Sequence, residues 1–340
     1  MAETPTLRSL LRSRIRGALL GGAVGDALGF PFEGSTHAFM SALGADVMKA
    51  FEAHRSGYFP AGQFSENTQM TLSTVEAILA AKEFSGREVA KGFLPLWREN
   101  RVIGRSTGCT EAISRLLDGT ADWRTSGCEE GWAGSGAAER AVPLGLWNYD
   151  EAQQLIEQAV LAAEITHRDP RAVAGAVGVA AAAAYSLTHR EIILGEWLDE
   201  VGGAMTSICP SFAQCLGELP RILSLGESDA LNAIEQLGKR ERSSETRGEQ
   251  SSSVVPTIMT AFYWFLRFPD EWVLTVCGCL RSGGDVSTIA AIGAGISGAF
   301  NGDGAIPDVL RQTVVDRDRI LQLADRLHNL KESQRQRSSR

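Results

Sequence analysis

The 340-residue sequence predicts an all-α protein, and three features of the chain point to this class. Apolar residues make up 44% of it but aromatic residues only 7%, a balance that favours tightly packed helices over a sheet sandwich. Small residues recur at helical spacing in two distant segments, residues 17–29 and 291–302. Elsewhere, apolar residues follow the spacing of amphipathic helices, as at Leu72, Val75 and Leu79.

The first predicted helix covers residues 10–29 and carries a bare stripe. Its second half has a glycine at every fourth position: Gly17, Gly21, Gly25 and Gly29. Each glycine costs a helix about 1 kcal/mol relative to alanine, so close packing or a ligand at the helix end must offset the cost. Residues 291–302 form a stripe of the same kind. We therefore expect the two helices to pack closely and to bring distant loops together.

Two carboxylates accompany the first helix. Asp26 lies inside its apolar run, where a carboxylate needs hydrogen bonds or positive charge. Asp26 is therefore either a structural acceptor or part of a site. Pro31 ends the helix and places Glu33 in the loop that follows. From the residues alone, this position is more typical of a solvated loop charge than of a catalytic carboxylate, and both alternatives stay open.

A polar group stands at the start of the helix that is predicted to end near residue 82. Ser65, Glu66 and Asn67 are three consecutive side chains with oxygen atoms. They suit a hard cation, which takes oxygen ligands. Ser65 also suits a simple helix cap, so this alternative stays open.

A matching group opens the helix that carries the second stripe. Gly283 and Gly284 free the backbone for a tight turn, and Asp285, Ser287 and Thr288 follow. Mg²⁺ takes carboxylate, hydroxyl and water oxygens. Capping of the helix is the alternative for this group taken alone. The two groups together favour a divided metal site.

The middle of the chain supplies more helices and two glycine-rich loops. Residues 104–110 resemble a phosphate cradle, although an ordinary capped loop explains them better. Gly134-Ser135-Gly136 is no dinucleotide fingerprint, because no β-branched strand precedes it. His167 stands at the junction of two helices, where structural roles are common. Further helices are predicted at residues 148–165, 172–187, 190–237, 254–268, 271–280 and 306–330.

Composition argues against several other classes. The net charge of -8 does not favour a nucleic-acid surface, and residues 1–7 lack a signal-peptide pattern. The longest apolar run, residues 172–187, falls short of the roughly 18 residues that span a bilayer, so it predicts a buried helix and no membrane partner. The six cysteines include no C-x-x-C pair, which predicts free thiols in a cytoplasmic protein and no zinc site built from them.

The predicted domain organisation is simple. We expect a single domain over residues 1–330. The charged, serine-rich segment at residues 239–253 predicts a surface loop within this domain. Residues 331–340 are polar and predict a frayed tail.

Taken together, the motifs resemble those of the ADP-ribosylglycohydrolase family, of the type that reactivates dinitrogenase reductase. They extend from residue 16 to residue 307, nearly the whole chain. They are the GALLGGAVGDALG run of residues 17–29 with Glu33, Thr68-Gln69-Met70-Thr71, the loop at residues 134–143, Thr166-His167-Arg168-Asp169-Pro170, and Gly283-Gly284-Asp285. Several ordered motifs in one chain are a more specific signal than any single one.

The resemblance implies an all-α fold with one or two Mg²⁺ ions in a central cleft, where they would bind the ribose of ADP-ribose and position a water molecule. The implied partner is ADP-ribose or an ADP-ribosylated protein. The resemblance implies catalytic roles for Glu33, Glu66 and Asp285. It implies contacts with the substrate for Gly134, Ser135, Gly136 and His167. The implied metal ligands are Ser65, Glu66, Asn67, Asp285, Ser287 and Thr288.

The chain departs from the family motifs at three of these positions. Glu66, Asn67 and Ser287 each stand where the family has aspartate. Only two of the four carboxylates in the motifs remain, so we expect one ion to bind better than a second.

Three functions stay open. The first, which we favour because every replacement keeps an oxygen ligand, is a hydrolase that removes ADP-ribose. The second is a catalytically weakened protein that binds ADP-ribose, with an immunity, sensor or regulatory role. The third is a purely structural helical protein, which leaves the paired polar groups and the costly glycines unexplained.

Overall fold

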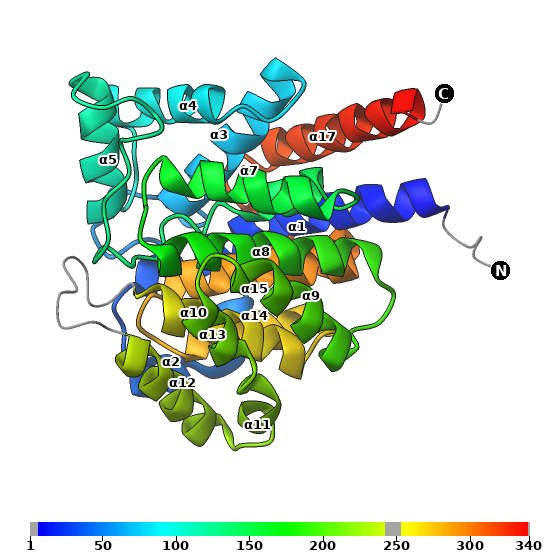
Figure 1. Ribbon diagram of the computed structural model, residues 1–340. Coiled ribbons are helices and arrows are strands. Elements are labelled where there is room, and N and C mark those ends of the chain that lie inside the picture. Colours follow the sequence, from blue (N-terminus) through cyan, green and yellow to red (C-terminus); the bar gives the residue numbers. More distant parts are fainter. Residues whose placement is uncertain (1–5, 242–252, 339–340) are drawn as a thin grey trace.

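The computed structural model describes residues 6–241 and 253–338, and every regular element within them is helical (Figure 1). Two isolated bridges, Cys128 with His167 and Gly134 with Ser253, are the β pairing found in this part of the chain. The predicted all-α class is confirmed. The helices are α1 (Leu7–Gly29), α2 (His37–Leu43), α3 (Glu66–Ala81), α4 (Gly86–Arg98), α5 (Thr107–Leu117), α6 (Val142–Trp147), α7 (Ala152–Glu164), α8 (Pro170–Thr188), α9 (Leu194–Thr206), α10 (Pro210–Leu216), α11 (Leu219–Leu223), α12 (Glu227–Glu241), α13 (Val254–Arg267), α14 (Trp272–Arg281), α15 (Val286–Asn301), α16 (Asp308–Thr313) and α17 (Arg317–Ser338), with short 3-10 turns η1 (Phe30–Phe32), η2 (Gly44–Met48) and η3 (Asp303–Ala305).

Helices α1 and α15 lie against each other in opposite directions along most of their length. A Cβ atom at Gly21 would lie 2.8 Å from the carbonyl oxygen of Ala294, and one at Gly29 would lie 2.6 Å from the Cα atom of Ser287. Only glycine allows two backbones to approach this closely. The predicted pairing of the two small-residue stripes is confirmed. It sets the end of α1 beside the start of α15.

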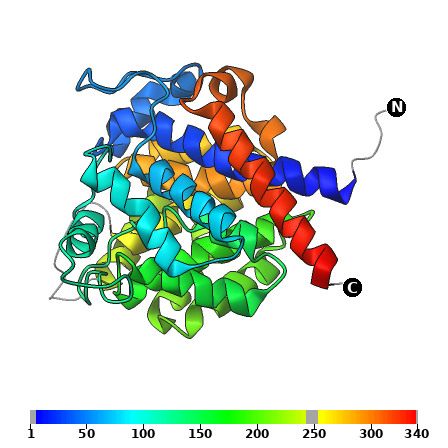
Figure 2. The ribbon, with the colours of Figure 1, turned by 90° about the horizontal axis from the view of Figure 1, so that it is seen from above.

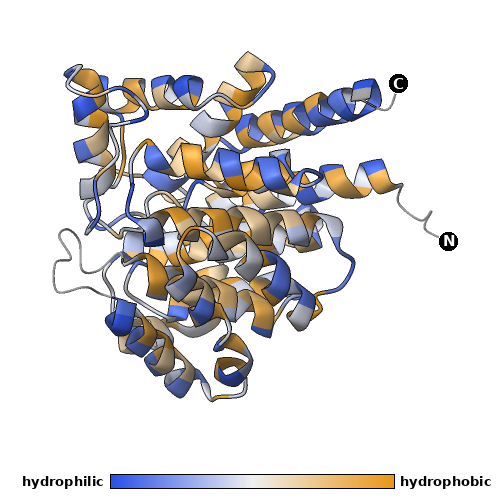
Figure 3. Ribbon diagram, in the orientation of Figure 1, coloured by the Kyte–Doolittle hydropathy of each residue, from blue (hydrophilic) through white to orange (hydrophobic). Residues whose placement is uncertain are grey.

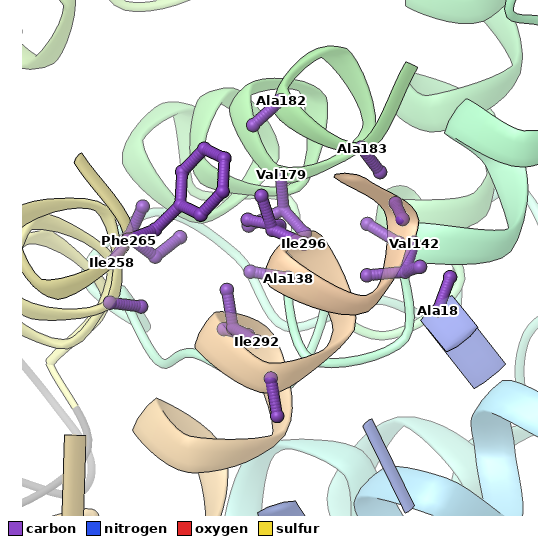
Figure 4. Close-up of a cluster of buried hydrophobic side chains, with 14 of the residues drawn as sticks. Ala18, Ala138, Val142, Val179, Ala182, Ala183, Ile258, Phe265, Ile292 and Ile296 are labelled. Carbon is purple, nitrogen blue, oxygen red and sulfur yellow. The ribbon is translucent and has the colours of Figure 1, made fainter. Parts of the chain in front are cut away.

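Helix α8 packs on α15 and completes the core. Figure 4 shows Val179 of α8 beside Ile292 and Ile296 of α15, with Ile258 and Phe265 of α13 in the same cluster. The length and apolar composition of α8 would suit a membrane span, but 83% of its most apolar window is buried inside the protein. Such enclosure is typical of a core helix, as predicted for residues 172–187.

The outer helices carry hydrophilic residues, whereas the inner helices are largely apolar (Figure 3). One outer helix, α17, crosses α1 (Figure 2) and continues to Ser338. The frayed tail expected from residue 331 is therefore wrong for the described residues. Lys331 is only 8% exposed, and its Nζ atom lies 2.5 Å from Oδ1 of Asp150. This tertiary contact holds as helix a segment that composition alone marks as a tail.

Two further expectations fall partly outside the described residues. The charged segment at residues 239–253 begins as the last turn of α12, and Ser253 directly precedes α13. Residues 242–252 lie outside the described ranges. Residues 1–5 also lie outside the described ranges. They belong to residues 1–7, whose sequence lacks a signal-peptide pattern.

Substitution of Gly17 tests the contact between α1 and α15. A Cβ atom at Gly17 would overlap the backbone carbonyl of Gly298, so Gly17→Ala must push the helices apart. We expect Gly17→Ala to lower the free energy of unfolding by about 2–3 kcal/mol in urea titrations. The control is Gly22→Ala, whose Cβ atom would lie 3.4 Å from its nearest neighbour, an ordinary contact. Equal stability of the two variants would contradict the role of the close approach.

Lys331→Met tests the structural role of the last turns of α17. The substitution keeps an apolar side chain of similar length but removes the ammonium group from Asp150 and from the rings of Trp147 and Tyr149. We expect a loss of about 1–2 kcal/mol in the free energy of unfolding, because a half-buried carboxylate loses a charged partner. Arg337→Met, at an exposed position on the same helix, is the control and should leave stability unchanged. A stability loss no larger for Lys331→Met than for Arg337→Met would restore the prediction of a dispensable tail.

Candidate active site

The buried carboxylate of Asp26 fixes the start of α3. Its Oδ2 atom accepts hydrogen bonds from the backbone N–H of Ser65 and of Thr68, both at 3.1 Å, and from the Thr68 hydroxyl at 2.7 Å. Burial raises the pKa of Asp26 to about 6, although these hydrogen bonds oppose the shift. Asp26 is thus a structural acceptor through Oδ2, whereas its Oδ1 atom is buried without a hydrogen-bond partner among the described residues, so a role in the site stays a prediction. Asp26 therefore lies next to the polar residues at the start of α3.

The start of α15 is tied to the loop that carries Glu33. Gly283 and Gly284 adopt positive φ angles of 73° and 74°, as the predicted turn requires. The N–H of Gly34 donates to the Gly284 carbonyl at 2.9 Å, which joins the two loops. The Oε2 atom of Glu33 then accepts from the N–H of Ser287 at 3.0 Å and from its hydroxyl at 2.7 Å. Glu33 is therefore oriented by α15 although it belongs to the loop after α1.

The two halves of the predicted metal site meet. The amide of Asn67 donates a hydrogen bond to the hydroxyl of Thr288 at 3.2 Å, across 221 positions of sequence. The predicted ligands of the two helix starts are all nearly buried: Ser65, Glu66, Asn67, Asp285, Ser287 and Thr288. Ser65 also caps α3, since its hydroxyl accepts from the N–H of Asn67 at 3.2 Å. Capping and convergence on one site therefore coexist.

The glycine loop before α6 adjoins the same place. The hydroxyl of Ser135 donates to Oδ2 of Asp285 at 2.9 Å. The predicted substrate loop and the predicted metal motif are thus in direct contact. Gly134 pairs with Ser253 through a bridge, which anchors the loop on the segment before α13.

His167 lies buried behind this loop. It is 3% exposed, and its Nδ1 atom lies 2.8 Å from the Thr166 hydroxyl. A Cβ atom at Gly136 would lie 2.8 Å from the imidazole, so glycine is needed for this approach. Burial and the charge of Arg140 lower the pKa of His167 to about 3, which keeps the ring neutral. The imidazole packs against Gly136 of the loop. Its contact with ADP-ribose stays a prediction.

Sequence reasoning missed three residues at this site. Ser106 donates its backbone N–H to Oε1 of Glu66 at 2.5 Å. Glu139 and Cys109 lie close by, and one ligand atom from each of Glu66, Cys109 and Glu139 falls within 4.8 Å of the others. For Glu139, the signal available in the sequence was a lone acid in an apolar stretch, the same signal that marked Asp26. Ala138 and Val142, which lie near Glu139 in the sequence, belong to the apolar cluster of Figure 4.

Burial and mutual repulsion raise the pKa values of acids at this site. Burial, followed by the charge of Glu66, raises the pKa of Glu139 well above its usual range. Desolvation, followed by the charge of Asp285, raises the pKa of Glu33 to about 8, although the residue as a whole is exposed. The site therefore holds two acids besides the two carboxylates left in the motifs, and without a cation their raised pKa values favour the neutral form. Such a set of acids and hydroxyls fits a divalent cation.

A cleft of about 450 Å³ opens beside Asp285. Gly283 and Gly284 line one side of it, and residues of α12 and α13, among them Glu235 and Thr260, line the other. A volume of this order accommodates a small-molecule ligand such as a nucleotide.

Known proteins resemble this chain over most of its length. Residues 7–337 match the model of the ADP-ribosylglycohydrolase family. An uncharacterised protein of Archaeoglobus fulgidus is 30% identical, over 89% of this chain and 92% of its own. The ADP-ribosylhydrolase ARH3 of Xenopus tropicalis is 29% identical, over 82% of this chain and 85% of its own.

A solved structure supports the fold. It is described as an ADP-ribosylglycohydrolase-related protein complex and aligns with a TM-score of 0.69 at 23% identity. The alignment covers 94% of this chain and 99% of the solved one. At this level of identity the likeness shows the fold alone.

Substitution of Thr68 tests the anchoring of α3. Thr68→Val keeps the shape of the side chain but leaves the buried Asp26 carboxylate with one donor fewer. We expect a loss of about 1–3 kcal/mol in the free energy of unfolding, measured by urea titration. Thr68→Ser retains the hydroxyl and should lose clearly less. If the two variants are equally stable, the hydroxyl does not anchor Asp26.

Proposed function

Because the chain belongs to the ADP-ribosylglycohydrolase family, we propose that it is a hydrolase that removes ADP-ribose from a modified protein side chain or a related ADP-ribosyl substrate. One observation carries the proposal. The starts of α3 and α15 converge through the contact of Asn67 with Thr288, next to the Glu33 carboxylate held by Ser287. Helix capping explains Ser65 at the start of α3, but α15 has no capping hydrogen bond to the side chain of Asp285, and capping does not explain the convergence.

We assign a divalent cation, Mg²⁺ in the first instance, to the oxygen atoms that the two helix starts offer. These atoms belong to Ser65, Glu66, Asn67, Asp285, Ser287 and Thr288. Carboxylate, amide and hydroxyl oxygens are the donors that Mg²⁺ prefers. A bound ion would polarise the ribose hydroxyls and orient a water molecule.

Glu33 is the residue that we propose as the proton acceptor. Two hydrogen bonds from Ser287 fix its Oε2 atom and so hold the carboxylate in one orientation. In the reaction, the water oxygen bonds to the anomeric carbon of the ribose while the bond from that carbon to the protein side chain breaks. Glu33 takes one proton of the water and passes it on to the departing side-chain atom, which regenerates the carboxylate.

Ser135 and the glycines beside it would position the substrate. The loop holds Asp285 through Ser135 and is backed by His167. Backbone N–H groups of such a loop suit phosphate oxygens. This arrangement would place the phosphates of ADP-ribose next to the cation site.

A second function, an ADP-ribose-binding protein with weakened catalysis, is favoured by a different observation. Ser287 stands in the place of a family aspartate and bonds to Glu33 through its hydroxyl. Asn67, also in the place of an aspartate, bonds to Thr288. Both replacements remove a negative charge from the proposed cation site. They weaken cation binding and with it catalysis.

The two functions separate in one experiment on Glu33→Gln. Release of ADP-ribose from ADP-ribosylated peptides is followed together with calorimetric binding of free ADP-ribose, each with and without Mg²⁺. For a hydrolase, Glu33→Gln should slow release by about 10²–10⁴-fold while ADP-ribose still binds. Glu83→Gln removes an exposed carboxylate in the loop after α3 and should match the parent.

The behaviour of the parent protein distinguishes the hydrolase from the ADP-ribose-binding protein. Binding of ADP-ribose without release from any acceptor (arginine, serine or another) would favour the binding protein. Rapid release by Glu33→Gln would contradict the role of Glu33. Neither binding nor release by the parent would contradict both functions.

A further inference from the structure

We infer that Glu66, Cys109 and Glu139 bind a divalent transition-metal ion, such as Zn²⁺, through two carboxylates and one thiolate. This site shares Glu66 with the predicted Mg²⁺ site but takes its other ligands from residues outside both motifs. It does not depend on the proposed hydrolysis, because binding of the metal can be measured alone.

The three side chains come from three separate elements. Glu66 opens α3, Cys109 lies in the first turn of α5, and Glu139 precedes α6. Their ligand atoms lie within 4.8 Å of one another. A tetrahedral zinc ion, with bonds of about 2.0–2.3 Å, holds its ligand atoms about 3.5 Å apart. The ligand atoms must therefore move closer together when the ion binds.

The carboxylate of Glu139 is the group that requires a cation. It is 6% exposed, and its Oε1 atom has no hydrogen-bond partner. The neighbouring Arg140 does not supply one, because its guanidinium donates to the carbonyls of Gly136 and Ala162 and to the Thr166 hydroxyl. A buried carboxylate without a partner is costly, more so when Glu66 stands next to it.

A small cavity adjoins Glu139, although Glu66 and Cys109 do not line it. A cavity of about 20 Å³ is lined by Glu139, Asn67 and Thr71, among others. This is enough for one water molecule with two or more polar partners. The open position of catalytic and ligand-exchanging zinc sites is filled by water in the same way.

The chemistry of the donors selects the metal. Two carboxylates and a thiolate carry three negative charges, which a divalent ion and the nearby Arg140 guanidinium balance. Thiolate is a soft ligand that favours Zn²⁺ and its neighbours over Mg²⁺. Cys109 is fully buried between Glu66 and Glu139, which distinguishes it from the other five buried cysteines as the one at an acidic cluster. The site is not a cysteine cluster, so the missing C-x-x-C pattern does not argue against it.

The test uses the full chain, stripped of metal by a chelator and then titrated with Co²⁺ as a spectroscopic probe and with Zn²⁺. We expect Co²⁺ to give the near-ultraviolet charge-transfer band of a cobalt–thiolate bond. Zn²⁺ should raise the melting temperature at concentrations where Mg²⁺ does not. Cys109→Ser should abolish the band, and Glu139→Gln should weaken Co²⁺ binding about 100-fold.

Two controls separate a ligand role from a structural one. Cys279→Ser removes another fully buried thiol, on α14, and should keep the band. Glu139→Gln should raise the melting temperature of the metal-free protein, because it removes one of two repelling carboxylates, yet abolish the shift produced by Zn²⁺. Binding of Co²⁺ without the band, or unchanged binding in Glu139→Gln, would overturn the inference. So would a melting temperature that does not respond to Zn²⁺ in the parent.

Discussion

The contact between α1 and α15 is the constraint on which the rest of the site depends. Glycines on both helices let the backbones touch, so that Gly29 reaches the first turn of α15. The end of α1 then lies next to Ser287, and Glu33 in the following loop can accept both of its hydrogen bonds. A wider separation of the helices would break this contact. The helix propensity lost to glycine is thus offset by packing that also builds the site.

Three helix starts converge on the same acidic region. Glu66 lies in the first turn of α3, Asp285 directly precedes α15, and Cys109 lies in the first turn of α5. The N-terminus of a helix carries a partial positive charge, which stabilises an anion placed there. This arrangement makes a cluster of carboxylates tolerable within an otherwise apolar core. It does not remove the effect of burial and of the neighbouring Glu66 charge, which together raise the pKa of Glu139.

Local patterns predicted more of this site than of its surroundings. The glycine stripes and the paired polar groups were readable because helical spacing and helix starts leave signatures in short stretches of sequence. Glu139 was not, since a single acid in an apolar run gives no distance to Glu66 or Cys109. The end of α17 was mistaken for a tail for a similar reason, because its anchor, Asp150, lies far away in sequence. Composition and spacing do not reveal contacts between residues that are distant in the sequence.

The departures from the family motifs remove negative charge at two positions, Asn67 and Ser287, and an acid outside the motifs lies close to the carboxylates that remain. Ser287 exchanges a carboxylate for a hydroxyl that donates to Glu33, so one wall of the site becomes a fixed hydrogen-bond pair. Glu139 adds a carboxylate on the opposite side, beside Glu66 and Cys109. Two hard ions about 3.5–4 Å apart need anionic ligands around both of them. The redistributed charge instead favours one ion on the Glu66 side, where a thiol is also available. The identity of the metal and the fate of catalysis are therefore coupled in this chain.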